Sequence, residues 1–335
     1  MSEDNPTPRK KDHWFREMKL SAGGAWFFPM IGATIAILFW FLFTVVVQPR
    51  RILNGHRVVI YTSQDQVYAE PILKEFEQQT GIEVRAVYDS ESVKTVGLIN
   101  RLVAEKDRPL CDLFWNNEEL RTRQLAAMGI FEKWAAVGHR SRRIAINTNK
   151  VSLAAAPRSL TELTNESWRG KVSLAYPLFG TTAAHFLALR QFWGAERWQN
   201  WCRALAANKP FLVDGNSVSA KLVAKGEAWV GLTDSDDIAA EQREGASIVP
   251  LPLTGESLLI QNTVALVRGA RHPQAAGKLY DYLQRPDVLE KLIAANALES
   301  VSPPIGPSAT LKPDWDNVLA ELEVGTTELK ENFLR

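Results

Sequence analysis

Residues 57–88 read RVVIYTSQDQVYAEPILKEFEQQTGIEVRAVY, and this stretch decides the fold class. The apolar run at 57–62 predicts a buried strand, and apolar residues at helical spacing between Tyr68 and Phe76 predict a helix after it. Residues 82–88 predict a second strand. A strand, a helix and a strand in this order are typical of a mainly parallel sheet that is covered by helices on both faces.

The rest of the chain repeats this alternation in two sets. We expect two α/β lobes joined by two extended crossings, at 143–149 and 259–267, with ligand-binding residues just after the carboxyl ends of the strands. Further strands are expected at 111–115, 143–147, 172–175, 228–233 and 258–267, and further helices at 92–104, 118–128, 181–191, 197–207, 217–225, 273–283, 286–297 and 315–324.

The composition excludes several classes of protein. The chain has 335 residues, a formal net charge of +1 and 46% hydrophobic residues. The near-neutral charge gives no field to hold a polyanion, so we expect no nucleic-acid partner. The hydrophobic share is too high for a disordered chain, and the length suits roughly two domains. Cys111 and Cys202 are too few for a disulfide scaffold. They fall in different predicted lobes, and we expect two buried thiols.

An apolar segment near the N-terminus predicts a membrane anchor. Residues 21–48 contain no charged side chain, and their densest part is 30–47, close to the about 20 apolar residues that a bilayer core requires. No small-residue cleavage site follows Val47, which argues against a cleaved signal peptide. More basic residues precede the segment than follow it, which favours a cytoplasmic N-terminus. We therefore expect a single-pass protein of the cell (inner) membrane whose soluble part faces the outside or the periplasm.

These features divide the sequence into five parts. We expect residues 1–20 to form a cytoplasmic tail and residues 21–48 to form the transmembrane anchor. The first lobe is expected to begin with 55–143, and the second lobe to comprise 144–262. Residues 263–335 are expected to return to the first lobe and to add the C-terminal helices.

Three further stretches extend the pattern of 57–88 into a family resemblance. They are WRGKVSLAYPLFGTTAAHFLAL at 168–189, VDGNSVSAKLVAKGEAWVGLTDSDD at 213–237 and LIQNTVALVRGARHPQAAGKLYDYL at 259–283. Over roughly 57–300 the chain resembles the extracellular solute-binding proteins of ABC importers, and among them the ferric-ion-binding group. The resemblance implies a two-lobed fold that closes about a hinge, and an ABC permease with its ATPase as partners.

The resemblance also implies roles for single residues. In the ferric-binding group a histidine follows the first strand, where this chain has Asp65. A glutamate that binds iron follows the third strand in that group, and Glu118 matches it. The group's adjacent tyrosine pair is lacking, because residues 233–237 read TDSDD. A companion anion in that group lies at a helix N-terminus, which corresponds to residues 180–182.

The acidic residues of this chain, taken alone, indicate a cation. Several of them follow predicted strands at the same sheet edge, and clustered carboxylates repel one another unless a cation lies between them. Oxygen ligands suit Mg²⁺, Ca²⁺, Mn²⁺ or iron, and also an ammonium group. The alternative is that each acid caps a helix, and we expect this of Asp237 above all. The candidate metal ligands are Asp65, Glu118, Asp234 and Asp236, and Glu91 is a further ligand-binding candidate.

A helix N-terminus predicted at Gly180 would face this acidic group. Its free N–H groups suit a phosphate or a carboxylate, although an ordinary helix junction with a threonine cap would have the same sequence. The two features together suit a metal ion with a companion anion, or a zwitterion such as an aminophosphonate or an amino acid. The polar candidates for this pocket are Ser63, Gln64, Asn116, Asn117, Gly180, Thr181, Thr182, Asn216 and Ser217.

Several other polar and aromatic residues are expected to be structural. His185 lies in the helix that begins near Gly180, but a lone histidine is more often structural than a metal ligand. Core packing is expected for Trp115 and for the tryptophan group Trp193, Trp198 and Trp201.

Catalytic motifs are missing from the sequence. It contains no G-x-S-x-G, H-E-x-x-H, C-x-x-C or P-loop pattern, so we expect a binding protein and not an enzyme. A hydrolase with two carboxylates across a cleft and a sensor ectodomain with a partner chain are the alternatives. The main hypothesis is a membrane-anchored solute-binding component of an ABC importer. It would bind an iron-like metal cation, with a companion anion, as the transported ligand and not as a cofactor.

Overall fold

The computed structural model describes residues 56–89, 96–301 and 310–334. The predicted cytoplasmic tail and transmembrane anchor, at 1–20 and 21–48, lie outside these ranges, so the structure does not test them. Within the described ranges, none of the helices combines the length and the apolar character that a membrane crossing requires.

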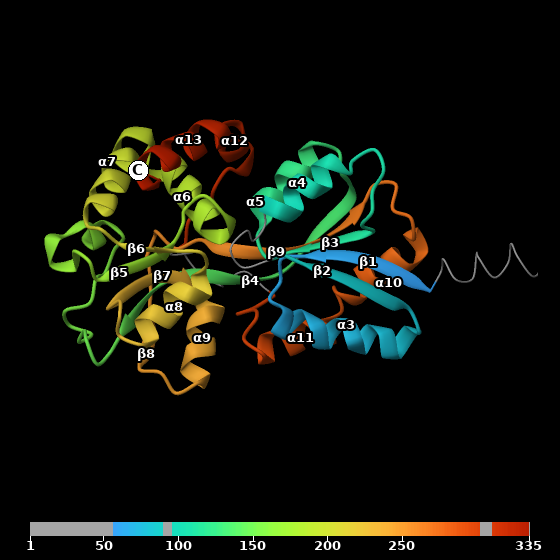
Figure 1. The fold of residues 1–335 in the computed structure, drawn as a ribbon, viewed down its shortest axis with the longest axis horizontal. Helices are drawn as coiled ribbons and strands as arrows, with labels where there is room; N and C mark the ends of the chain where they lie inside the picture. Colours follow the sequence, from blue (N-terminus) through green and yellow to red (C-terminus); the bar gives the residue numbers. More distant parts are fainter. Residues whose placement is uncertain (1–55, 90–95, 302–309, 335) are drawn as a thin grey trace, which may run out of the picture. The chain divides into compact units, whose positions relative to one another are not determined.

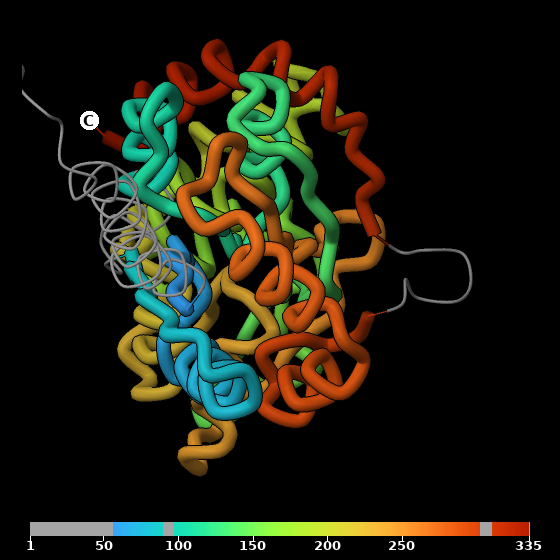
Figure 2. Tube along the Cα trace, turned by 90° about the vertical axis from the view of Figure 1, so that its right-hand side faces the viewer, coloured from blue at the N-terminus to red at the C-terminus, as the bar shows by residue number. Residues whose placement is uncertain are grey.

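Lobe 1 is a sheet with helices on both faces (Figure 1). Its strands are β1 (Arg57–Thr62), β2 (Glu83–Tyr88), β3 (Leu113–Asn116), β9 (Leu259–Val267) and the first half of β4 (Phe131–Asn147), and its helices are α3 (Gln66–Thr80), α4 (Val96–Ala104), α5 (Glu119–Ala127), α10 (Pro273–Tyr282) and α11 (Pro286–Ala294). β2, β1 and β3 are parallel, and β9 pairs antiparallel with β3 and β4. α3 lies beside α10 and α11 over one face (Figure 2), and α4 and α5 cover the other.

The first helix follows directly from its sequence. α3 buries an apolar stripe between Ala69 and Phe76, as the helical spacing predicted, and this stripe packs on the β1 side chains in the lobe-1 core. The helix ends at Gly81, which has a φ of 67° and donates its N–H to the Glu77 carbonyl. A residue without Cβ adopts this left-handed conformation without strain, so the chain can turn into β2 at that point.

Lobe 2 repeats the layered arrangement. Its strands are the second half of β4 with β5 (Val172–Ala175), β6 (Phe211–Val213), β7 (Val230–Asp234) and β8 (Ile248–Leu251), and its helices are α6 (Gly180–Trp193), α7 (Ala195–Ala207), α8 (Asn216–Ala224) and α9 (Ser235–Arg243), with 3₁₀ turns at Thr161–Thr164 and Glu166–Trp168. The short strands β6 and β8 were not predicted. The larger core contains the apolar face of α6 and α7, and a smaller core lies under α8 and α9.

β4 and β9 are the two strands that cross between the lobes. β4 pairs with β9 from Phe131 to Ser141 and with β7 from Arg142 onward, so one strand serves both sheets. The predicted strand began at Arg143 and was too short, because β4 begins at Phe131. The change of partner at Ser141 and Arg142 lies within two residues of the predicted crossing. The polar and basic residues of 132–143 hid the strand, since two of its arginines are buried against acidic partners and not against apolar ones.

The C-terminal segment forms two helices where one was predicted over 315–324. These are α12 (Trp315–Ala320) and α13 (Leu322–Phe333). α13 packs on α6 and α7 of lobe 2, whereas α12 packs on α5 of lobe 1 and α6 of lobe 2. Arg190 of α6 binds Glu321, and its Nε lies 2.7 Å from a carboxylate oxygen of Glu328. The end of the chain thus contacts both lobes.

Candidate functional site

A pocket between the lobes contains most of the predicted ligand-binding residues. Its empty volume, which includes open solvent at its mouth, is about 550 Å³. Lobe 1 contributes Asp65 and Asn117, the crossing strand β4 contributes Arg140, and the rest comes from lobe 2. The lobe 2 lining is Ala175, Tyr176, Phe179, Gly180, Thr181, Asp214, Gly215, Asn216, Ser217, Asp234, Asp236 and Asp237.

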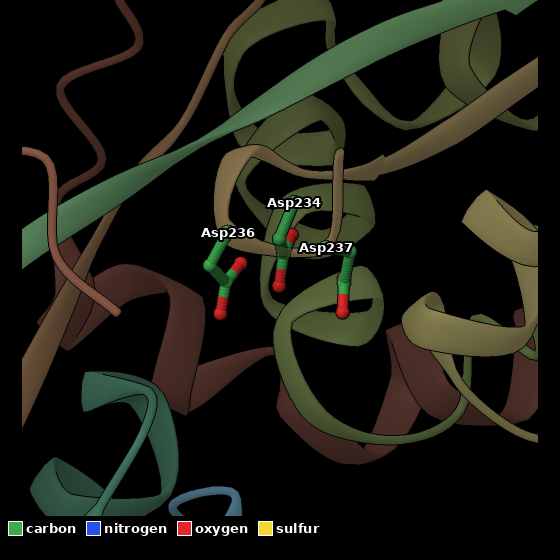
Figure 3. A group of neighbouring side chains, drawn as sticks. All are labelled: Asp234, Asp236 and Asp237. Carbon is green, nitrogen blue, oxygen red and sulfur yellow. The ribbon is translucent and has the colours of Figure 1, made fainter. Parts of the chain in front are cut away.

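Three aspartates form the acidic part of the pocket (Figure 3). Asp234 ends β7 and is the N-cap residue of α9, and Asp236 and Asp237 lie in the first turn of that helix. One carboxylate oxygen from each lies within 4.8 Å of the others, and Figure 3 shows the three side chains extending to the same side. Asp65 lines the same pocket from lobe 1, directly before α3. The structure therefore brings three of the four predicted metal ligands to one pocket.

Two arginines of β4 hold Asp234 from behind. Arg142 is the register partner of Asp234, and its Nη1 lies 2.5 Å from Asp234 Oδ1. Arg140 Nη2 lies 3.3 Å from Asp234 Oδ2, which also accepts a hydrogen bond of 2.8 Å from the Thr181 hydroxyl. Burial alone would raise the pKa of Asp234, but the two guanidinium groups outweigh it and hold this pKa below its usual range.

The negative charges of Asp236 and Asp237 are less well balanced by positive neighbours than that of Asp234. Arg140 Nε lies 3.2 Å from Asp236 Oδ1, but this buried oxygen accepts no hydrogen bond from the described residues. Burial is the main cause that raises the pKa of Asp236 to about 7, and the neighbouring carboxylates of Asp234 and Asp65 add to it. Burial and then the Asp236 charge raise the pKa of Asp237 well above its usual range. A positive group placed here would relieve this repulsion.

Two helices of lobe 2 begin next to Asp234, because Thr181 of α6 and Asn216 of α8 both hydrogen-bond to its carboxylate. The N-cap residues Phe179 of α6 and Gly215 of α8 make no side-chain capping hydrogen bond in the described structure. The first N–H groups of a helix have no acceptor within the helix, and the helix dipole favours negative charge at this end. The hydroxyl of Thr181 donates to Asp234, and the hydroxyl of Thr182 donates to Asn216, so both hydroxyls hold pocket residues in place.

Some predicted site residues lie elsewhere. Glu118 is 1% exposed and caps α5, where both of its oxygens accept from the Arg121 N–H at 3.1 and 3.2 Å. It is not part of the pocket lining given by the described residues, and burial raises its pKa to about 7. Ser63 supports the lobe 1 wall from behind, because its hydroxyl hydrogen-bonds to Asn116 and Asn117. Gln64 is buried next to Asp65, and Glu91 lies outside the described residues.

Sequence reasoning missed several lining residues. Arg140 was hidden because the first half of β4 did not look like a strand. Tyr176 and Phe179 follow β5, so the rule that ligands bind after strand ends would have found them. Asp214 was missed because it follows β6, a strand that was not predicted. The sequence did hold one indication of this strand. Arg140 and Arg142 are two positions apart, which puts both side chains on one face of a strand.

The residues expected to be structural are buried, except Trp193, which is partly buried. The Nε2 atom of His185 lies 2.6 Å from the Glu256 carbonyl oxygen, and burial, followed by the charge of Arg142, lowers its pKa to about 3. Trp115 is in the lobe 1 core, and Trp198 and Trp201 are in the larger lobe 2 core. Trp193 packs against that lobe 2 core. Cys111 and Cys202 are free, buried thiols, as predicted.

The sequence pattern of the bacterial extracellular solute-binding proteins matches residues 57–295. The chain belongs to this family. Among curated relatives, the major ferric iron-binding protein of Neisseria meningitidis serogroup A is 21% identical over 307 residues, which cover 83% of this chain and 91% of that protein. The resemblance to the ferric-ion-binding group is therefore confirmed.

Solved structures of similar proteins support the two-lobed fold. The iron-bound protein HitA of Pseudomonas aeruginosa has a TM-score of 0.70 at 19% identity, covering 82% of this chain and 98% of HitA. The periplasmic binding protein AfuA of Actinobacillus pleuropneumoniae, solved with exogenous fructose-6-phosphate bound, has a TM-score of 0.73 at 19% identity, covering 83% and 98%. At this identity the similarity establishes the fold, and the two relatives are described with different ligands.

Proposed function

We propose that this solute-binding protein is the membrane-anchored receptor of an ABC importer and that its ligand carries a positive group and a negative group. The positive group would bind at Asp236 and Asp237, with Asp65 facing them from lobe 1. The negative group would bind at the N-terminus of α6. The observation that carries this proposal is the under-compensated pair Asp236 and Asp237 in a pocket that both lobes line.

The first candidate ligand is a metal cation, iron-like in its preference for oxygen, with a companion anion. The aspartate cluster supports it, because three carboxylate oxygens within 4.8 Å of one another match a metal-binding group. The uncapped start of α6 supports the companion anion. The chain offers Tyr176 as a tyrosine in the lining, but the segment after β7 contains aspartates where the resemblance to the ferric-ion-binding group implies adjacent tyrosines.

The second candidate is a zwitterionic organic solute such as an aminophosphonate. The state of Asp234 favours it, because Arg142, Arg140 and Thr181 already occupy both of its oxygens. An ammonium group needs fewer ligands than a metal ion and could donate its three hydrogens to the remaining carboxylates. A covalently attached phosphonate or carboxylate would then reach the α6 N-terminus without a separate anion.

Thermal shift and calorimetry on the full chain in mild detergent test this proposal. The probes are Fe³⁺, Mn²⁺, Zn²⁺ and Ca²⁺, each with and without phosphate, and 2-aminoethylphosphonate. A true ligand must raise the melting temperature, because it binds the native state. We expect Asp236→Asn and Asp237→Asn to abolish the shift and Glu118→Gln, outside the pocket lining, to keep it. The proposal fails if no probe shifts the melting temperature, or if the shift survives in both aspartate variants.

The membrane anchor is a separate part of the proposal. Residues 21–48 are uncharged and long enough to span a bilayer, so they would hold the receptor near its permease and ATPase. Alkaline carbonate extraction of cell membranes tests this directly. We expect the full chain to stay in the pellet and a variant without residues 21–48, with a secretion signal in their place, to appear in the periplasmic fraction. Release of the full chain by carbonate would contradict the anchor.

A further inference from the structure

Two buried arginines lie directly behind the acidic part of the pocket. Arg142 is 0% exposed and Arg140 is 3% exposed, although isolated cations are almost never fully buried without partners. Their partners include the pocket aspartates themselves. Arg142 binds Asp234, and Arg140 lies within 3.3 Å of both Asp234 and Asp236. The acidic pocket therefore has positive charge fixed in its wall.

These contacts divide the aspartates into two kinds. Asp234 is a structural counter-ion, because Arg142 occupies one of its oxygens and Thr181 and Arg140 occupy the other. Asp236 keeps a buried oxygen that accepts no hydrogen bond from the described residues while its side chain lines the pocket. Asp237 accepts a hydrogen bond of 3.0 Å from the Thr233 hydroxyl at Oδ2, and it lines the same pocket. Asp236 and Asp237 are thus the carboxylates that remain for a ligand.

The charged side chains around the pocket determine how much positive charge a bound ligand can carry. Asp65, Asp234, Asp236 and Asp237 carry four negative charges when ionised, and Arg140 and Arg142 cancel two of them. Asp214 also lines the pocket, but it is exposed, so water and salt screen its charge. Counted over these six side chains, a doubly positive group neutralises the remaining two negative charges, and a singly positive group leaves one. A trivalent ion at Asp236 would leave excess positive charge a few ångströms from the Arg140 guanidinium.

We propose that Arg140 and Arg142 are specificity-determining residues that restrict the pocket to ligands whose positive group carries one or two charges, and that they exclude the bare ferric ion. Arg140 is the more direct of the two, because it lines the pocket and approaches Asp236. Arg142 acts through Asp234, which it removes from the set of available ligands. This inference rests on the proposed function, because it concerns the same pocket.

Charge-changing variants of Arg140 test the inference. Calorimetry on the full chain in mild detergent would compare Fe³⁺ supplied with citrate, Mn²⁺ and 2-aminoethylphosphonate. We expect wild type to bind Fe³⁺ more weakly than the better of the other two probes, and Arg140→Lys, which keeps the charge, to preserve this order. Arg140→Gln should shift the affinity ratio toward Fe³⁺ by about tenfold or more, since the repulsive charge is gone.

A second variant guards against misfolding of Arg140→Gln. Asn117→Asp adds a negative charge to the lobe 1 wall and leaves both arginines in place, and its Oδ1 can still accept from the Ser63 hydroxyl at the present 3.1 Å. It should shift the ratio toward Fe³⁺ as well. Preference of wild type for Fe³⁺, or an unchanged ratio in both variants, overturns the inference alone. If no probe binds wild type or any variant, the proposed function fails and the inference fails with it.

Discussion

Arg142 and Asp234 are opposite each other in the register of β4 and β7, and their side chains form an ion pair next to the pocket. Both side chains are almost completely buried, at 0% and 2% exposure. A buried pair of this kind contributes little net stability compared with apolar residues, but it is costly to break on one side. The pair therefore fixes where the pocket aspartates lie and makes Asp234 different from its neighbours.

The first prediction separates the two kinds of aspartate by stability. Asp234→Asn leaves the Arg142 charge buried without its counter-ion, so the free energy of unfolding should fall by about 3–5 kcal/mol. Asp236→Asn removes a carboxylate whose pKa is raised to about 7, so stability near pH 8 should stay the same or rise. Urea unfolding of both variants and wild type measures the difference. Equal destabilisation by the two variants would show that Asp236 is as firmly paired as Asp234.

The second prediction concerns His185, which is buried in its neutral form. Its pKa of about 3 in the folded protein lies below the about 6.5 of an unfolded histidine, so only the unfolded chain binds a proton between these values. Stability from this residue is therefore complete above about pH 6.5 and is lost as pH falls, by about 1.4 kcal/mol per pH unit.

His185→Gln provides the matched comparison, because it keeps an N–H donor for the Glu256 carbonyl and does not titrate. Unfolding free energies at pH 7.5 and pH 5.5 should show a larger loss in wild type than in the variant. The titration of the pocket aspartates is common to both proteins and cancels in this difference. Parallel pH dependence of the two proteins would be inconsistent with a buried neutral histidine.

The third prediction tests the contact between the C-terminal helix and lobe 2. A Cβ on Gly325 of α13 would lie 2.5 Å from a methyl carbon of Leu187, which is buried in the core under α6. Gly325→Ala should therefore destabilise the protein by about 1–3 kcal/mol through overpacking. Gly277→Ala in α10 is the control, because nothing lies within 4 Å of its Cβ position. There the substitution should stabilise by about 0.5–1 kcal/mol, as expected for alanine in a helix interior.

Both glycine variants are compared by thermal or chemical unfolding. Opposite signs would support the packing of α13 on α6, since both sites have helical backbone and differ in the space around the new methyl group. A stabilising effect of Gly325→Ala would mean that α13 does not pack tightly on Leu187.

The sequence predicted the fold well where local patterns agree with tertiary structure. The strand and helix at 57–80 have an apolar period that the core then uses, and Gly81 ends the helix as expected. It predicted much of the pocket lining, because Asp65, Asn117 and Thr181 follow strands and Asp234 ends one. These are local rules, and they hold without knowledge of the partner.

The prediction failed where a residue's role depends on a partner far along the chain. From the sequence alone, Arg140 and Arg142 would be placed on the surface. In the structure they are buried, and both pair with Asp234, which lies more than ninety positions away in the sequence. Glu118 matched a metal ligand by its position after a strand, but its oxygens turn to the N–H of Arg121 and cap a helix. The first outcome depends on a partner that is distant in the sequence. The second depends on the direction of the Glu118 side chain, which its position after a strand does not determine.

The last prediction links the crossing strand to ligand binding. Gly138 lies in β4 at a shift of register between Ala136 and His139, with a φ of 99°. A Cβ there would lie 2.8 Å from a methyl carbon of Leu298 and 3.1 Å from the Ser300 carbonyl oxygen. Gly138→Ala should therefore destabilise the protein by about 1–3 kcal/mol, and it should also move Arg140, which follows two residues later in the same strand.

Gly245→Ala separates the two effects, because Gly245 also has a positive φ, of 84°, but nothing lies within 4 Å of its Cβ position. Both variants should lose stability from the backbone conformation alone. Only Gly138→Ala should weaken binding of the probe that wild type binds best, because only this site is connected through β4 to the guanidinium beside Asp236. Equal affinity in the two variants at matched stability would show that the position of Arg140 does not depend on the register shift.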